Sequence, residues 1–142
     1  MSFDLDRFVK AQQNTYDRAL SELIAGRKQS HWMWFIFPQI QGLGRSDTAR
    51  FYAISGRPEA EAYLAHPVLG PRLKECTQAM LDHPTSTAHD ILGSPDDLKF
   101  RSSMTLFAAV ADQSALFQTA LRQFYNGAHD RETLSVISGL EQ

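Results

Sequence analysis

The sequence predicts an all-α protein, folded as a single compact domain of about seven to nine helices. Apolar residues recur at helical spacing along the chain, and no segment sustains the alternation typical of a strand. Capping residues and prolines stand where those helices would begin or end. The length of 142 residues suits one domain, 1–142, and no repeat, linker or low-complexity tract divides it.

The N-terminal helix has the clearest pattern. Residues 3–26 carry one continuous apolar stripe, which predicts a single amphipathic helix. Asp4 is its expected N-cap, and Gly26 suits the left-handed position that follows a helix.

The next elements are shorter. Ser30 is the expected cap of a helix over 31–37, which Pro38 ends because proline disfavours helical geometry in the residue before it. Periodicity alone also allows a buried strand here, and the helical neighbours favour the helix. The glycines of 39–45 predict a loop, and a serine cap then predicts a helix over 46–54.

The middle of the chain predicts three further helices. Proline near the start favours one over 58–66, and an apolar face predicts another over 67–83. Thr87 and Asp90 have the spacing of a capping box for a short helix that ends at Gly93.

The C-terminal part begins with the strongest start signal. Residues 94–97 (SPDD) offer a serine cap, a proline and two acids for a helix that runs to about Ala111. Helices over 113–125 and 131–138 follow, with Asn126-Gly127 as the cap between them.

Composition excludes several classes of protein. The formal net charge of −2 argues against a dedicated nucleic-acid binder and against a polybasic membrane role. A single cysteine, Cys76, cannot form an internal disulfide, and the scattered histidines lack zinc-site spacing. The acidic N-terminus and short apolar runs predict neither a signal peptide nor a membrane span. We therefore expect a cytoplasmic protein without metal or cofactor.

The segment 30–39 (SHWMWFIFPQ) is the most unusual stretch. Trp32 and Trp34 would offer a stacking surface to a planar or sugar-like ligand, with His31 as a donor or proton-transfer group at its edge. The alternative interpretation is a short apolar segment that threads the core. If it is core, at least one indole N–H requires a buried polar partner.

Charge is concentrated around this segment. Residues 27–57 contain five basic residues and one acid, a net +4, which leaves −6 for the rest of the chain. Within this stretch, Gly42 and Gly44 precede a predicted helix start, where free amides and Arg45 would hold a phosphate or carboxylate. An ordinary turn with a solvated arginine is the alternative.

The segment 94–107 (SPDDLKFRSSMTLF) is the second candidate region. Asp97, Arg101 and Thr105 share one helical face, and Arg101 beside Ser102 would grip an anion, with Lys99 nearby. An intrahelical Asp97–Arg101 pair with solvated serines explains the same pattern without a ligand.

Catalytic residues are indicated only by type. His31 would serve as general acid or base with Asp96 or Asp97 as its carboxylate partner, although no spacing fixes their geometry. The chain has no nucleophile elbow, and Cys76 on an apolar helix face is expected to be an inert core thiol.

These two segments, with Gly42-Leu43-Gly44 and residues 66–70 (HPVLG), resemble a family of small uncharacterised bacterial and fungal proteins. Some members carry the label "calpastatin", which we interpret as a mislabelling. The resemblance covers nearly the whole chain and implies a mainly helical single domain of unknown function. It implies no substrate, cofactor or catalytic residue.

Two functions from different classes follow. The first is a pocket for an anionic, phosphate-bearing small molecule, such as a nucleotide or ADP-ribose-like compound, with or without catalysis. Trp32 and Trp34 would wall it, His31 would stand at its rim, and Arg45 and Arg101 would hold the anion. The second is a non-catalytic interaction module whose arginines recognise an acidic partner, which predicts an exposed apolar patch. Nucleic-acid binding through the local +4 stretch is a third, disfavoured possibility.

Overall fold

The computed structural model describes residues 3–140, over which the chain forms ten helices and no strand beyond one isolated bridge. The helices are α1 (Asp6–Gln13), α2 (Tyr16–Ala25), α3 (Met33–Ile36), α4 (Asp47–Phe51), α5 (Arg57–Ala65), α6 (Leu69–Leu81), α7 (Ala88–Leu92), α8 (Asp96–Val110), α9 (Ala115–Tyr125) and α10 (Arg131–Leu140). The predicted all-α fold is confirmed, with one helix more than the upper end of the expected range. Within the described part no helix is long and apolar enough to cross a membrane.

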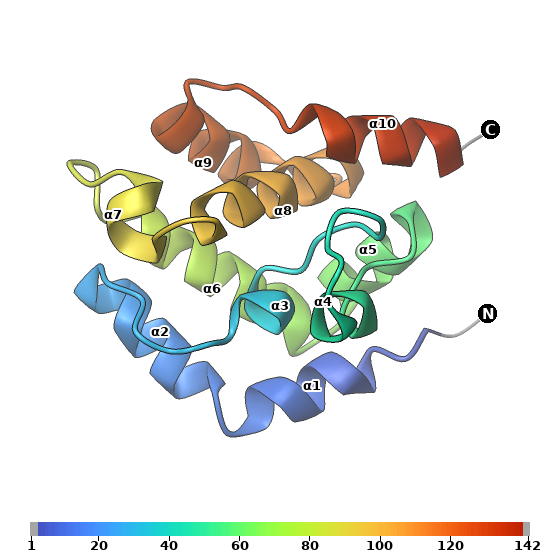
Figure 1. The fold of residues 1–142 in the computed structure, drawn as a ribbon, viewed down its shortest axis with the longest axis horizontal. Coiled ribbons are helices and arrows are strands. Elements are labelled where there is room, and N and C mark those ends of the chain that lie inside the picture. The colour runs from blue at the N-terminus through green and yellow to red at the C-terminus, as the bar shows by residue number, and fades with distance from the viewer. Residues whose placement is uncertain (1–2, 141–142) are drawn as a thin grey trace.

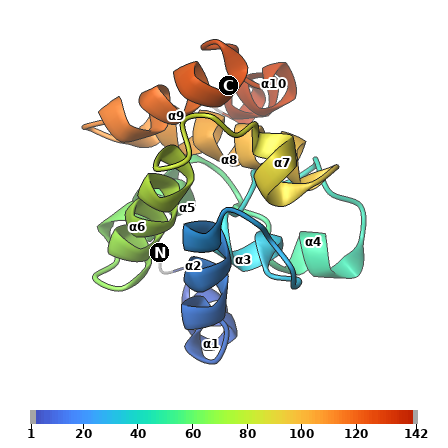
Figure 2. The same ribbon diagram turned by 90° about the vertical axis from the view of Figure 1, so that its left-hand side faces the viewer.

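The helices stack in tiers. In Figure 1, α1 and α2 lie at the bottom, α8, α9 and α10 at the top, and α3 to α6 between them. Figure 2 shows α3 and α4 on one side of this middle tier and α5 and α6 on the other. The helix α8 contacts α5, α7, α9 and α10, so it is the element around which the upper half packs.

Large aromatic side chains fill the space between the tiers. Phe8, Phe37, Phe100 and Phe107 are all completely buried. Phe37 on the middle tier meets Phe100 on α8 edge to face at 4.8 Å between ring centres, a favourable geometry for aromatic pairs. This contact fixes the segment after α3 against the first half of α8.

The predicted N-terminal helix is wrong in one respect, because it is two helices. The chain turns at Asn14 and Thr15, so α1 packs on α3 while α2 packs on α6. Gln12, buried at this turn, donates its side-chain amide to the Phe35 carbonyl at 2.7 Å. Asp4 does not cap α1, which begins at Asp6 after Leu5 and has no side-chain cap.

Two further predicted helix caps, both serines, are also wrong. Ser30 does not cap α3, because its hydroxyl donates to Glu22 at 2.6 Å. Ser94 lies outside α8, whose N-cap position is taken by Pro95 without a side-chain cap hydrogen bond. Helix α3 therefore begins later than Ser30 predicts, and α8 begins later than Ser94 predicts.

Other local signals are confirmed. Ser46 accepts the Ala49 amide at 3.1 Å, although α4 ends before residue 54 because Ile54 bridges to Ile40. Thr87 and Asp90 form the predicted capping box. Asn126 adopts the predicted left-handed conformation after α9, with φ of 55°.

Candidate functional site

The two segments singled out in the sequence meet at one cleft between α3 and the start of α8, which lie one above the other in Figure 1. Its volume is about 270 Å³. We call it the Trp34 cleft, and it is lined by Lys28, His31, Trp32, Met33, Trp34, Ser94, Pro95, Asp96 and Lys99. The cleft brings together five of the candidate residues: His31, Trp32, Trp34, Asp96 and Lys99. The first and the last of them lie more than sixty positions apart in the sequence.

A carboxylate on α2 organises the loop that leads into the cleft. Glu22 accepts the backbone amides of Gln29 and Ser30 at 2.7 and 3.0 Å, and the Ser30 hydroxyl. It also accepts the indole N–H of Trp32 at 2.9 Å. Burial alone would raise the Glu22 pKa, but these hydrogen bonds, first that of the Ser30 hydroxyl, lower it to about 2. Glu22 is therefore a fixed anion that shapes residues 29–32.

Sequence reasoning missed Glu22 as a positioning residue. The sequence indicated only that at least one indole N–H requires a buried polar partner if the segment is core. It did not indicate which residue is that partner. Glu22 lies on a helix of ordinary amphipathic pattern, where a glutamate is expected to be solvated.

The two tryptophans have different environments. Trp32 is completely buried and offers no exposed ring face, so its predicted role as a stacking surface is wrong; it supports the cleft from inside. Trp34 is partly exposed, with the His31 ring centre 6.4 Å from its own and the Lys99 Nζ 6.0 Å from its ring. Of the two tryptophans, only Trp34 is therefore partly exposed at this cleft.

Two lysines share one carboxylate inside the cleft. Lys28 Nζ lies 3.0 Å from Asp96 Oδ2, and Lys99 Nζ lies 3.6 Å from Asp96 Oδ1. The Lys28 and Asp96 side chains are only 11% and 18% exposed. With His31 neutral, the residues that line the cleft carry one excess positive charge, in a site partly shielded from water.

A second hollow, of about 410 Å³, continues beyond Pro95 and Lys99, which line both. We call it the α8–α10 hollow; its other lining residues are Gln39, Leu43, Gly44, Leu98, Arg101, Ser102, Asp130 and Glu132. The predicted Arg101 and Ser102 thus lie beside the Trp34 cleft rather than in it.

Arg101 and Ser102 also fasten the chain before α10 onto α8. The Arg101 guanidinium donates to the carbonyls of Ala128 and His129 at 2.9 and 2.8 Å. The Ser102 hydroxyl donates to Asp130 Oδ2 at 2.9 Å. The expected intrahelical pair with Asp97 is replaced by these contacts to the segment between α9 and α10.

Two predicted residues lie outside both hollows. Arg45 is exposed, and only its neighbour Gly44 reaches the α8–α10 hollow. Asp97 faces His89, whose Nδ1 is 3.7 Å from its Oδ2. Neither residue has a place in the candidate site.

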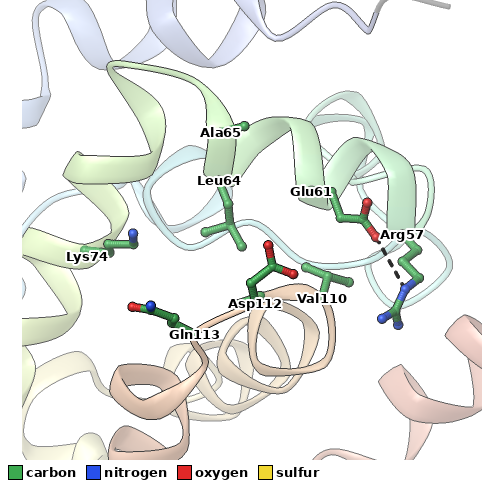
Figure 3. Close-up of a pocket in the computed structure, with 9 residues that line it drawn as sticks. Arg57, Glu61, Leu64, Ala65, Lys74, Val110, Asp112 and Gln113 are labelled. Carbon is green, nitrogen blue, oxygen red and sulfur yellow. Dashed lines mark ion pairs between the residues drawn. The ribbon is translucent and has the colours of Figure 1, made fainter.

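A third hollow, which at about 620 Å³ is larger than the other two, lies elsewhere, between α5, α6 and the α8–α9 turn (Figure 3). We call it the α5–α9 hollow; it is lined by Arg57, Glu61, Leu64, Ala65, Lys74, Val110, Ala111, Asp112 and Gln113. Figure 3 shows Glu61 paired with Arg57, at 3.4 Å, and Asp112 between Leu64 and Val110. Its two acids balance its two bases and its lining holds no aromatic ring, so the Trp34 cleft is the stronger candidate.

The described residues support neither a metal site nor a reactive cysteine. Among residues 3–140, no three His, Cys, Asp or Glu side chains are grouped closely enough to hold a metal ion. Cys76 is buried, and burial raises its pKa to about 12, so its thiol stays protonated at neutral pH.

Comparison with known proteins identifies relatives. A family model described as "Protein of unknown function (DUF1810)" matches residues 2–137. The structure is similar to that of the conserved hypothetical protein Rv1873 from Mycobacterium tuberculosis, determined at 1.38 Å. The two sequences are 49% identical, with a TM-score of 0.94 over 96% of this chain and 97% of the other. No curated protein matches the chain.

Proposed function

Because the chain belongs to the DUF1810 family, whose function is unknown, we propose a function from the geometry of its cleft. The protein binds a small anionic ligand, of the phosphate-bearing class, in the Trp34 cleft. Family membership confirms the resemblance based on the two sequence segments. A cytoplasmic location, expected from composition, is part of this proposal.

The observation that carries the proposal is the pair of lysines around a single carboxylate. An anion that enters beside Asp96 meets the ammonium groups of both Lys28 and Lys99, each already directed into the cleft by its ion pair. The N-terminus of α8 adds partial positive charge at the same place. Charge-assisted hydrogen bonds in a partly shielded site are stronger than those at an open surface.

Trp34 supplies the second element of recognition. Its partly exposed ring accommodates a planar group or the apolar face of a sugar, beside the anion site. His31 is exposed at the rim, where it can donate a hydrogen bond or exchange a proton with a bound ligand. Nucleotides and ADP-ribose-like compounds, which join a planar ring to phosphate, belong to this ligand class.

A thermal-shift screen of phosphate-bearing metabolites, followed by calorimetry, tests the proposal. A ligand at 100 times its Kd stabilises the folded state by about 2.7 kcal/mol, which a melting curve resolves. We expect Lys99→Ala to weaken binding at least about tenfold, which corresponds to about 1.4 kcal/mol.

Lys74→Ala is the matched control, because Lys74 lines the α5–α9 hollow. It should leave the affinity unchanged. Binding that survives Lys99→Ala but is lost in Lys74→Ala would move the site to the larger hollow and overturn the proposal.

A second candidate is an interaction surface for an acidic partner. Phe51 on α4 is 57% exposed, and its sequence neighbour Arg50 and Arg45, just before α4, are also exposed. Under this proposal, reversing charge with Arg45→Glu and Arg50→Glu abolishes capture of the partner. Full capture by the double variant would contradict it.

A further inference from the structure

The Trp34 cleft and the α8–α10 hollow share a wall, made by Pro95 and Lys99. We infer that one ligand spans both, with its phosphate in the Trp34 cleft and a hydroxyl-rich group of the sugar type in the α8–α10 hollow. This inference rests on the proposed anion site and adds the class of ligand, a sugar monophosphate ester.

Size favours a ligand that reaches beyond the first cleft. Small-molecule sites usually measure about 300–1,000 Å³. The Trp34 cleft, at about 270 Å³, falls just below that range, and the adjoining hollow adds about 410 Å³. A ligand confined to the cleft would leave the larger hollow, on the other side of Pro95 and Lys99, to water.

The charges in the α8–α10 hollow exclude a second anionic group. The carboxylates of Asp130 and Glu132 line it, and they would repel a phosphate. Both cations that line it already have partners: Arg101 donates to the carbonyls of Ala128 and His129, and Lys99 pairs with Asp96.

The same hollow also disfavours a cationic group, because Lys99 and Arg101 are among its lining residues. An ionised carboxylate accepts hydrogen bonds and donates none, so a ligand group that contacts Asp130 or Glu132 must be a donor. Neutral hydroxyl groups are donors that neither sign of charge repels. The side-chain amide of Gln39 adds both a donor and an acceptor at the same wall.

Asp130 is held in place before any ligand arrives. Its Oδ2 accepts the Ser102 hydroxyl at 2.9 Å and the Thr133 amide at 3.2 Å, and its own amide donates to Thr105 at 2.9 Å. Thr105 and Thr133 are completely buried, so these contacts are shielded from water. A preorganised acceptor loses little conformational freedom on binding. Ser102 is thus a positioning residue for this carboxylate.

The hollow also has an apolar side. Leu98, 56% exposed, and Leu43 stand among its lining residues. Apolar walls with a few placed polar groups are typical of small-molecule sites, and a sugar ring presents both C–H and hydroxyl surfaces.

Isothermal titration calorimetry with inorganic phosphate, glycerol 3-phosphate, glucose 6-phosphate, ribose 5-phosphate and ribose 1,5-bisphosphate tests the inference. We expect at least one of the two sugar monophosphates to bind wild-type protein about tenfold or more tightly than inorganic phosphate. Glu132→Gln should remove most of that margin while the affinity for inorganic phosphate stays unchanged. The melting temperature checks that this variant, altered at an exposed residue, folds.

A matched control is Glu61→Gln, in the α5–α9 hollow, which should alter neither affinity. Three results overturn the inference but spare the anion site: equal affinity for phosphate and every sugar phosphate, an unchanged margin in Glu132→Gln, or tighter binding of the bisphosphate than of the monophosphates. Failure of every phosphate compound to bind wild-type protein, or binding indifferent to Lys99→Ala, overturns the proposed function and the inference with it.

Discussion

Trp32 and Trp34 stand two residues apart in one short segment, yet they belong to different parts of the molecule. Trp32, just before α3, is completely buried and donates its indole N–H to Glu22. Trp34, in the first turn of α3, is partly exposed at the cleft. The inner side of this segment is a core anchored by a polar contact, and the outer side is the surface at which we propose that a ligand binds.

The largest expected effect tests the inner side. Trp32→Ala should lower the free energy of unfolding by about 3–5 kcal/mol, because it opens a cavity in the core and leaves Glu22 without the indole donor. Urea denaturation monitored by circular dichroism measures this loss. A loss below about 1 kcal/mol, the range of surface changes, would break the distinction between the two tryptophans.

Glu22 sharpens the same distinction through pH. Glu22→Ala should cost about 2–3 kcal/mol at neutral pH, since it orphans the Trp32 indole and loop amides. Because folding lowers the Glu22 pKa from 4.5 to about 2, its stabilisation is present in full above the unfolded value and is lost as pH falls toward 2. The stability difference between wild type and variant should therefore shrink over that window.

The control for Glu22 is Glu61→Ala. Glu61 makes an exposed i,i+4 pair with Arg57, so its removal should change stability by less than about 0.5 kcal/mol. If the difference in unfolding free energy between wild type and Glu22→Ala stays constant from about pH 5 to about pH 2, the hydrogen-bonded Glu22 carboxylate is contradicted.

Arg101 tests whether a residue that lines the α8–α10 hollow also has a structural role. Arg101→Lys retains the charge but loses the fork that reaches two carbonyls, so we expect a stability loss of about 1–2 kcal/mol. Hydrogen exchange should quicken in α10, whose start depends on these contacts. Unchanged exchange there would contradict the fastening of the chain before α10 by Arg101.

Trp34 should show a small effect on stability and a large effect on binding. Trp34→Ala is expected to cost about 1 kcal/mol in folding, since the ring is partly exposed, and to weaken a phosphate-bearing ligand about tenfold. Arg45→Ala, outside both hollows, should leave affinity unchanged in the same calorimetric titration. If Trp34→Ala binds the ligand as tightly as wild type does, the Trp34 ring takes no part in the site.

The elements that sequence predicted best are those with local causes. The Thr87–Asp90 capping box and the left-handed Asn126 depend on neighbours within a few residues, and both are confirmed. The turn at Asn14 splits a continuous apolar stripe because α1 and α2 pack on different helices, information that no short window contains.

The features of the candidate site also divide into those predictable from local sequence and those that depend on tertiary contacts. Residue chemistry identified the two segments that meet at the Trp34 cleft, and it named Lys99 and Asp96 within them. Their meeting, the contribution of Lys28 and the anchoring by Glu22 arise from tertiary contacts between α2, α3 and α8. The separate fates of Trp32 and Trp34 likewise depend on which side of the segment packs against the core.

Nuclear magnetic resonance of the indole N–H groups tests the central claim most directly, because the chain contains only two tryptophans and so gives two resolved signals. In a titration with a phosphate-bearing ligand, we predict a saturable shift of the Trp34 signal that exceeds any shift of the Trp32 signal. The Lys99→Ala variant should saturate at a higher ligand concentration. A ligand that binds while the Trp34 signal stays fixed, or shifts only amides around residues 57–65 and 110–113, would contradict an anion site in the Trp34 cleft.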